Sequence, residues 1–471
     1  MKIKLGILIL LLISACTMAP KYKQPELPIA ENWPGENTSI DEEQKAASIK
    51  WQDFFQSSQL QDIIKITLEN NTNLKSAVLN IEAARALYRI KAGNIYPPLD
   101  ATASGSRRHN TDKSSSTGKD FITSIYDANL NTSYELDLFG RVQSLKDAAL
   151  EDFLSTTEAR NALQVSLIAE TANAYLQWLA DVKTLKITTD TLKVQEESYA
   201  LISKSFESGI SSKLDVLQSK SIVENIKVNV ALYSRRVALD KNALILLMGK
   251  NSEEVFQNKL ELEKVELIKD LPVGLPSTVL LLRPDVKAAE HQLRSMNANI
   301  GAARAAFFPR ISLTAAFGFS SSSLASLISG GAFGAWSFAP KITAPIFEGG
   351  SNKANLQYAK VKNEMAINQY NKVIQTAFRE VADELVARKT ISEQFNAQKN
   401  LIQTAKETYD LAHTRYKNGI IRYINVLDAQ RTLFQAEQNA IEIEKLQLSN
   451  LVNLYKVLGG GWEELKIETK K

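Results

Sequence analysis

The sequence of 471 residues contains one cysteine and three histidines, and this scarcity limits the chemistry that the chain can perform. A single cysteine, Cys16, allows neither a disulfide within the chain nor a cysteine-based metal cluster. The histidines, His109, His291 and His413, are far apart and share no spacing typical of metal ligands. The sequence also contains no motif typical of a catalytic triad, a zinc protease or a phosphate-binding loop. We therefore expect no enzyme, no metal and no cofactor.

Strong charge of either sign is also absent. The net charge of +4 is too small to indicate a nucleic-acid partner, and no basic patch alternates with aromatic residues. The apolar run from Leu5 to Ile13 is too short to cross a bilayer as a helix. It follows Lys2 and Lys4, as in a signal peptide, here residues 1–15. The segment Ile13-Ser14-Ala15-Cys16 resembles the bacterial lipobox, which predicts lipidation at Cys16 rather than an ordinary cleavage site beside an incidental cysteine.

Glycine and proline are missing from several long stretches. Two runs of 68 residues lack both, and each is followed by a similar run of 39 residues. The glycines that bound these runs form three pairs, each 210 residues apart: Gly140 and Gly350, Gly209 and Gly419, and Gly249 and Gly459. Such a fixed spacing indicates an internal duplication. A helix of 68 residues is about 100 Å long, so each half is predicted to be a very long helical hairpin.

The shorter runs show a seven-residue apolar repeat, which predicts that they pair as left-handed coiled coils. In the first half the repeat comprises Val216, Val223, Val230, Val237 and Leu244. The segment from Trp51 to about Asn70 is predicted to form a short amphipathic helix. A further helix precedes the strands of each half, at residues 71–96 and 283–308. Its length and that of the shorter run together nearly match the long helix. We therefore expect the two shorter helices to stack end to end along the long one.

Four segments alternate apolar and polar residues with a period of two, as strands do. They cover about 99–106, 122–138, 311–320 and 333–346, although Pro340 and Pro345 fit a strand poorly. One face of each is apolar or aromatic and the other is polar. A half-buried soluble sheet shows the same alternation, but transmembrane strand length and the lack of a covering apolar segment favour a lipid-facing barrel wall. Four strands cannot close a barrel, so several chains must share one.

These elements define the domain organisation. The predicted order is a signal peptide (1–15), a lipid-anchored extended tether (16–50), a first repeat (51–282) and a second repeat (283–471). The first repeat contains a long helix at 141–208, a return helix at 210–248 and a waist segment at 250–282; the second contains a long helix at 351–418 and a return helix at 420–458. The fold class is mainly α with a transmembrane β part.

Several short motifs, in the same order along the chain, resemble those of one protein family. They are Cys16 with Ala19-Pro20-Lys21-Tyr22-Lys23-Gln24-Pro25, Tyr134-Glu135-Leu136-Asp137-Leu138-Phe139-Gly140-Arg141, Leu281-Leu282-Arg283-Pro284-Asp285, Arg415-Tyr416-Lys417-Asn418-Gly419, Val426-Leu427-Asp428-Ala429-Gln430-Arg431, and Leu454-Tyr455-Lys456-Val457-Leu458-Gly459-Gly460-Gly461-Trp462. The family is that of the TolC-like outer-membrane efflux proteins, in particular the lipid-anchored branch that serves resistance-nodulation-division pumps.

This resemblance implies a homotrimer with a 12-stranded β-barrel in the bacterial outer membrane that continues into a periplasmic tunnel of 12 helices. It implies a passive duct without catalysis, which receives small molecules from an inner-membrane resistance-nodulation-division pump through a periplasmic adaptor protein. Outer-membrane lipid is a further expected partner, and nucleic acid is not. The sequence does not indicate whether drugs, metal ions or other solutes are exported.

The resemblance also implies a periplasmic gate beside the two hairpin turns at Gly209 and Gly419. The implied gate residues are Asp215, Arg415, Tyr416, Arg422, Ile424, Asn425 and Asp428. Asn425 and Ile421 depart from the residues found in a well-known member of the family. For each polar residue taken alone, a solvated helix face is the alternative interpretation.

Two other functions share parts of this pattern. A related duct for type I protein secretion is disfavoured by the lipobox, which that branch usually lacks. A lipid-anchored coiled coil without a pore is disfavoured by the strand pairs at the helix ends.

The lipobox generates a first testable prediction. Cys16→Ala should abolish acylation, because the thiol is the attachment atom, while trimers still reach the membrane through their strands. Mass spectrometry of the mature N-terminal peptide measures this directly. An intact, unmodified Cys16 peptide in the mature wild-type protein would contradict the assignment.

Overall fold

The computed structural model describes residues 17–34, 49–111, 120–257, 261–273, 279–329 and 333–462. The predicted signal peptide and the lipidation site at Cys16 lie outside these residues. The chain divides into two compact units. The sheet unit comprises Met1–Glu26, Asn80–Thr157 and Ala288–Tyr370, and the hairpin unit comprises Leu27–Leu79, Glu158–Lys287 and Asn371–Lys471.

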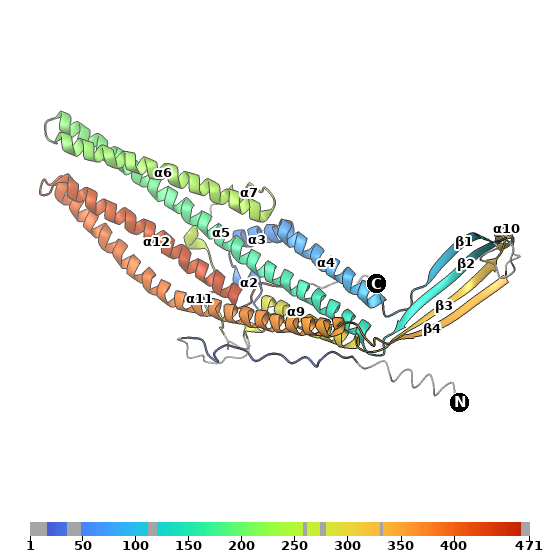
Figure 1. Ribbon diagram of the computed structural model, residues 1–471. Helices are drawn as coiled ribbons and strands as arrows, with labels where there is room; N and C mark the ends of the chain where they lie inside the picture. Colours follow the sequence, from blue (N-terminus) through green and yellow to red (C-terminus); the bar gives the residue numbers. More distant parts are fainter. Residues whose placement is uncertain are drawn as a thin grey trace. The chain divides into compact units, whose positions relative to one another are not determined.

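The described residues form mainly helices and one four-stranded sheet (Figure 1). In chain order the elements are α2 (Trp51–Phe54), α3 (Ser58–Asn70), α4 (Thr72–Gly93), β1 (Asp100–Asn110), β2 (Phe121–Leu136), α5 (Arg141–Glu207), α6 (Lys213–Met248), α7 (Glu254–Gln257), η3 (Leu262–Lys264), α9 (Pro284–Ala305), β3 (Arg310–Ser321), α10 (Leu324–Ile328), β4 (Phe333–Thr343), α11 (Ser351–Lys417) and α12 (Tyr423–Val457). No helix in the described part of the chain combines the length and the apolar character needed to cross a membrane.

In the sheet unit, the strands lie side by side in the order β1-β2-β3-β4, and every pair is antiparallel. The register aligns Leu130 with Phe317 on the neighbouring strand, and Phe317 with Trp336 on the next. These three side chains share one face and are 48%, 63% and 78% exposed. Asn129 pairs with Thr102 and thus belongs to the opposite face. Among the described residues, the side chains on this apolar face of the sheet are therefore largely uncovered.

The last strand is shorter than expected. β4 ends at Thr343 rather than near residue 346, because Pro345 follows and a proline cannot donate to the strand ladder. Pro340 lies inside β4, opposite Leu313. Its place is an edge strand of the sheet within this chain, where proline is tolerated.

The first described residues of the sheet unit form an extended strap, Thr17–Gln24, that is bound to the helices. Its carbonyl at Pro20 accepts a hydrogen bond from Asn297 (2.8 Å), and Gln24 Nε2 donates to the Tyr370 hydroxyl (3.0 Å). A Cβ at Gly301 would lie 2.8 Å from Ala19 Cα, so a residue without a side chain is required where the strap crosses α9. The strap is therefore seated on the helices rather than free.

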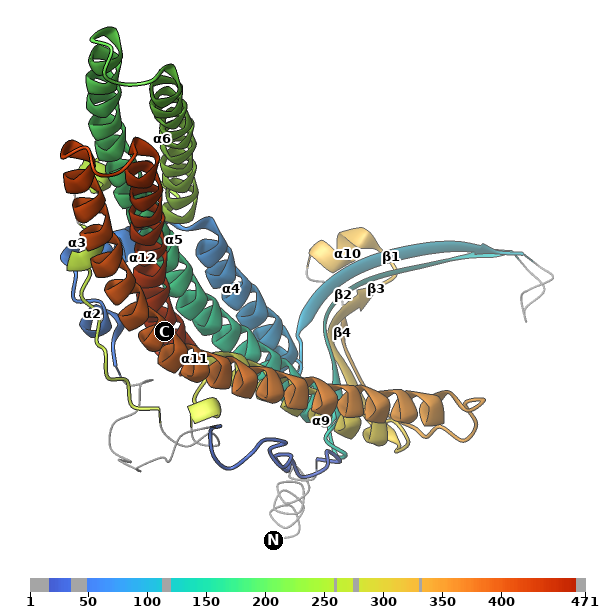
Figure 2. The same cartoon turned by 90° about the vertical axis from the view of Figure 1, so that its left-hand side faces the viewer.

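Within the hairpin unit, α5 and α6 form one antiparallel hairpin, and α11 and α12 form another (Figures 1 and 2). The heptad residues Val216, Val223 and Leu244 of α6 are buried, as expected for a coiled-coil seam. The region expected to be one helix from Trp51 to Asn70 is broken. Phe55 pairs instead with Leu267 in an isolated β-bridge, which draws the backbone out of the helix.

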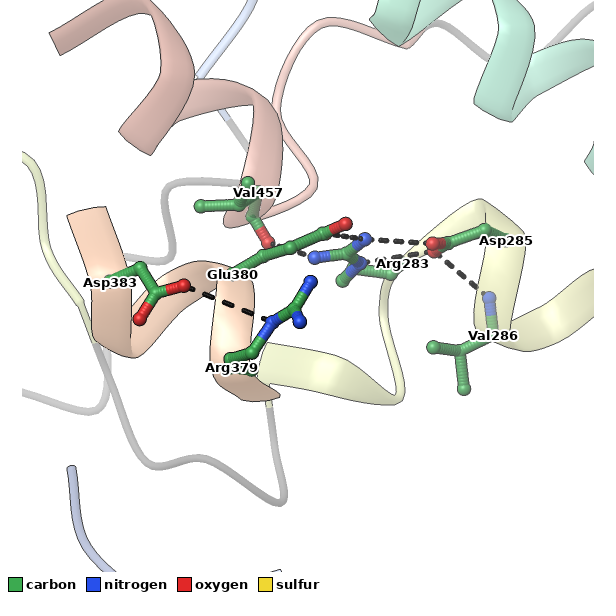
Figure 3. A network of polar contacts seen from close by, with 7 residues as sticks. All are labelled: Arg283, Asp285, Val286, Arg379, Glu380, Asp383 and Val457. Atoms are coloured by element: carbon green, nitrogen blue, oxygen red, sulfur yellow. Dashed lines mark hydrogen bonds and ion pairs between the residues drawn. The ribbon is translucent and has the colours of Figure 1, made fainter. Parts of the chain in front are cut away.

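The end of each return helix meets the start of another helix through one side-chain hydrogen bond. In the first repeat, Asn71 Nδ2 donates to the carbonyl of Leu247 (2.8 Å). In the second, Arg283 Nη1 donates to the carbonyl of Val457 (3.0 Å; Figure 3). The two carbonyls are 210 residues apart, so different side chains make the same joint in both repeats. The two shorter helices of each repeat thus meet end to end.

The Arg283 joint contains more charge than its counterpart. The guanidinium is almost buried, and it forms a bidentate pair with Asp285 (3.0 and 2.7 Å) and a second pair with Glu380 of α11 (2.8 Å; Figure 3). Two carboxylates and a helix-end carbonyl compensate for removing this cation from water. Arg283 thereby fixes α9, α11 and α12 to one another at this point.

The register generates a prediction about the membrane face. Leu130→Arg places a charge on the uncovered apolar face and should cost about 2–4 kcal/mol near the bilayer midplane. Asn129→Arg, on the opposite face of the same strand, is the matched control and should be far milder. Heat stability of the trimer on gels after reconstitution measures both. Equal damage from the two substitutions would mean that the faces are assigned the wrong way round.

Candidate functional site

Both hairpin turns have the same backbone geometry. Gly209 and Gly419 have φ values of +74° and +71°, in the left-handed region that favours glycine. The amide of Ile210 donates to the Ser205 carbonyl (2.9 Å), and that of Gly209 to the Phe206 carbonyl (2.9 Å). The second turn repeats this pair of bonds, which defines a Schellman motif at the end of each long helix. The duplicated glycines are thus required by backbone conformation.

The helices that leave these turns begin differently. At α6, Ser212 and Asp215 form a capping box: the Asp215 amide donates to Ser212 Oγ (3.2 Å), and the Ser212 amide donates to Asp215 Oδ2 (3.1 Å). The equivalent positions at α12 hold Arg422 and Asn425, and Arg422 provides no side-chain cap. The carboxylate of Asp215 is therefore committed to stabilising the start of α6.

The apolar side chains at this end of the hairpin unit gather into one core, the tip cluster. Its buried members are Ile202, Val216, Ala412, Tyr423, Val426, Leu427 and Ala429, and Tyr199, Ile222, Tyr409, Tyr416, Ile421 and Ile424 pack against it. The members come from α5, α6, α11 and α12. The rings of Tyr416 and Tyr423 lie 5.2 Å apart, and burial raises the pKa of the Tyr423 hydroxyl. Packing thus joins the two hairpins of one chain at their turns.

Three polar residues at the start of α12 lie on the side of the helix that faces away from the tip cluster. Arg422, Asn425 and Asp428 are spaced three residues apart, and all three are exposed. Asp428 Oδ1 accepts a hydrogen bond from Arg431 Nη2 (3.0 Å), and the Asp428 side chain remains 62% exposed. An ion pair this exposed contributes little to stability. These residues thus form an exposed polar stripe at the start of α12, and this polar stripe can contact a neighbouring molecule.

The structure brings together only part of the site expected from the sequence. Tyr416 and Ile424 contact the tip cluster, whereas Arg415 is exposed on α11. No hydrogen bond or ion pair between described residues joins Asp215 to Arg415, Tyr416 or Arg422. The Asp215 carboxylate accepts hydrogen bonds from the amide and the hydroxyl of Ser212.

The importance of Tyr423 and Leu427 as buried residues was missed from the sequence. One signal was present: Tyr199 and Tyr409 lie 210 residues apart and so occupy the same position in the two repeats. Both pack on the tip cluster. An aromatic residue repeated beside both turns could have indicated a shared core. The described residues contain no group of three potential metal ligands.

Comparison with known proteins places the chain in a family. The model of the family described as "Outer membrane efflux protein" matches twice, at residues 63–250 and 275–460. The chain is 46% identical over 457 residues to the antibiotic efflux pump outer membrane protein ArpC of Pseudomonas putida, covering 96% of this chain and 94% of the relative. The toluene efflux pump outer membrane protein TtgC of the same species has the same identity and coverage.

Solved structures agree with the sequence matches. The open state of the Neisseria gonorrhoeae MtrE outer membrane channel superposes with a TM-score of 0.85 at 38% identity. The match covers 95% of this chain and 98% of that channel. The similarity therefore extends over both repeats and includes the strands as well as the helices.

The tip cluster generates a prediction about local stability. Tyr423→Ala should remove a buried ring from the cluster and cost about 3 kcal/mol of local stability. Arg422→Ala, one residue away and exposed, should stay within about 0.5 kcal/mol. Hydrogen–deuterium exchange of the amides around both turns measures the difference. Similar exchange in the two variants would show that the cluster does not hold the hairpins together.

Proposed function

The chain belongs to the outer membrane efflux protein family, and from this premise we propose that three copies form the outer-membrane duct of a tripartite efflux system. The protein is a bacterial outer-membrane protein whose helices form a periplasmic tunnel. The proposed duct is passive: an inner-membrane pump supplies the energy, and a periplasmic adaptor protein joins the pump to the duct.

The observation that supports the shared barrel most directly is the open sheet. The order β1-β2-β3-β4 leaves β1 and β4 each with one unpaired edge. In lipid, unpaired backbone amides and carbonyls have no water to bind, so the edges must pair with other copies. Three copies of this sheet provide twelve strands, above the eight of the smallest natural barrels. The uncovered apolar face then contacts lipid.

The proposed cargo follows from the relatives. ArpC is described as part of an antibiotic efflux pump and TtgC as part of a toluene efflux pump. We propose small apolar or amphipathic molecules as the cargo here, with the choice among them made by a pump of the resistance-nodulation-division type. Type I protein secretion remains the alternative duct function.

The proposed lipid anchor agrees with the position of the strap. Thr17 directly follows Cys16, and its hydroxyl lies 3.1 Å from that of Ser144 in the first turns of α5. Helix α5 begins shortly after β2 ends. Thr17, the neighbour of the proposed lipidation site, thus lies close to the end of the sheet where the strands give way to helices, which supports an anchor at the periplasmic surface of the membrane.

The proposed gate lies at the turns, with Asp428 as its acidic residue. Because Asp428 is exposed on the polar stripe, three copies around a symmetry axis would form a ring of carboxylates. Such a ring attracts cations and repels anions. Arg415, Arg422 and Asn425 are further exposed polar residues at this end, and they would make their contacts with neighbouring copies.

The experiment that tests the duct is the current through the purified protein in a planar lipid bilayer. Stable single-channel steps are expected, together with drug sensitivity of a strain that lacks the protein. An absence of channels in correctly inserted trimers would favour a structural coiled coil. Channels without any change in drug sensitivity would favour another cargo, such as a secreted protein.

The acidic ring generates a further prediction. Asp428→Ala should weaken cation selectivity and block by multivalent cations, because the carboxylates that attract these ions are lost. Glu224→Ala, also an exposed carboxylate in an ion pair but on α6, is the matched control and should leave both unchanged. Reversal potentials in a salt gradient measure selectivity. Unchanged selectivity in Asp428→Ala would remove this residue from the gate.

A further inference from the structure

A chain of polar side chains crosses three helices of the hairpin unit away from the turns. Lys445 of α12 donates from Nζ to Gln177 Oε1 of α5 (2.8 Å). Gln177 Nε2 then donates to Asp181 Oδ2, one helical turn further along α5 (3.0 Å). Asp181 is only 6% exposed, and its carboxyl meets that of Asp240 on α6. The series of hydrogen bonds that starts at Lys445 and passes through Gln177 thus ends at a contact between two carboxyl groups.

The directions of these hydrogen bonds limit where a proton between the Asp181 and Asp240 carboxyls can lie. A lysine ammonium can only donate, so it fixes the Gln177 amide with Oε1 toward Lys445. The amide nitrogen must then face Asp181, whose Oδ2 can only accept. Oδ2 of Asp181 therefore accepts from Gln177 and is not the oxygen that donates to Asp240. For two carboxyls in contact, a hydrogen bond requires a proton on one of them, and burial together with the charge of Asp181 favours the proton on Asp240.

The surroundings of Asp240 do little to offset the cost of burying a negative charge on this carboxyl. Its Oδ2 is buried, and no donor in the described part of the chain reaches it. Neither Asp181 nor Asp240 forms an ion pair with a described residue. The charged groups near Asp240 are Arg236 on α6 and Lys445 on α12, each acting at longer range, while the adjacent Lys241 is paired with Glu253. Two ionised carboxylates would therefore repel each other with little relief.

We propose that Asp181 and Asp240 form an acid pair that binds one shared proton and joins α6 to α5 in a pH-dependent manner. The protonated pair provides a hydrogen bond across the hairpin, and the deprotonated pair places two like charges in contact. The site is a property of the single chain, so it does not depend on the proposed duct.

The electrostatics give the pH range. Burial, followed by the hydrogen bond with Asp181 and the charge of Asp181, raises the pKa of Asp240 from 3.8 to about 6. Because the folded pKa lies above the unfolded one, the folded state binds this proton more tightly than the unfolded chain does. The stabilisation is full below pH 3.8 and is lost as the pH rises through about 6. The joint between α6 and α5 is thus tighter in mildly acidic conditions than at neutral pH.

The consequence for α6 is local. Beyond Asp240, the helix buries Leu244 and Met248, and the Leu247 carbonyl accepts the hydrogen bond from Asn71. Repulsion at Asp240 acts on the last turns of α6, directly before the end-to-end joint with α4. Deprotonation should therefore loosen this end of the hairpin first.

The test is hydrogen–deuterium exchange of residues 236–248 in the purified full-length protein at pH 5 and pH 7.5, corrected for intrinsic rates. The opening equilibrium of wild type should increase about tenfold between the two pH values, as a folded pKa near 6 and an unfolded one near 4 require. Asp240→Asn keeps a donor toward Asp181 without the titration, so it should stay protected at both. Asp190→Asn, an exposed carboxylate on α5, should behave as wild type.

A second variant tests the effect of the Lys445 charge on Asp240. Lys445→Met removes a positive charge that favours ionised Asp240, so the midpoint of the pH dependence should move to higher pH. The proposal is overturned if wild-type protection in α6 does not change between pH 5 and 7.5, or if Asp240→Asn retains the wild-type pH dependence. If Asp240→Asn does not fold, the wild-type pH profile alone still decides.

Discussion

The unpaired edges of the sheet are the constraint on which the rest of the structure depends. β1 and β4 each have one partner in the chain, and backbone groups at an open edge cannot be left unpaired in lipid. The single chain is consequently an incomplete folding unit, with its aromatic sheet face exposed. The same incompleteness accounts for apolar side chains such as Leu87 and Ile90 of α4, which are about 60% exposed in one chain. They have no explanation until neighbouring copies are present.

The two repeats show which features of the duplicated unit are set by the backbone and which are not. The glycines at both turns have nearly the same positive φ, since the Schellman geometry excludes most side chains there. The side chains at equivalent positions of the two repeats, by contrast, differ in their chemistry. Ser212 and Asp215 cap α6, whereas Arg422 and Asn425 occupy the same places at α12 and do not. The joint made by neutral Asn71 in one half is made by an ion network around Arg283 in the other.

The sequence was most informative where a local pattern determines structure. Long runs without glycine or proline predicted α5 and α11, which end directly before the glycine turns, and alternation predicted four strands and their faces. One error arose where a distant contact competes with local preference: Phe55 leaves its expected helix because Leu267 offers a β-bridge. The early end of β4 has a local cause instead, because Pro345 follows it.

The candidate site was harder to predict from the sequence. The sequence located Asp215, Tyr416 and Asp428 beside the turns, but the Ser-x-x-Asp spacing of Ser212 and Asp215, a local signal of a capping box, was missed. The tip cluster depends on the register between four helices. The pairing of Asp181 with Asp240 depends on the register within one hairpin, and no short motif records it.

The strap and the described residues that follow it before α2 also limit the order of events during synthesis. Gln24 bonds to Tyr370, the ring of Trp33 stacks on that of Phe378 at 5.0 Å, and the Ile49 carbonyl accepts from the Tyr455 hydroxyl (2.6 Å). The partners of this N-terminal segment therefore lie along the whole chain, from Ser144 of α5 to Tyr455 of α12. Its full set of contacts cannot form until α12 has been made. Complete docking of the N-terminal segment thus requires that α12 has been synthesised, whereas the helices of one hairpin can pair before that.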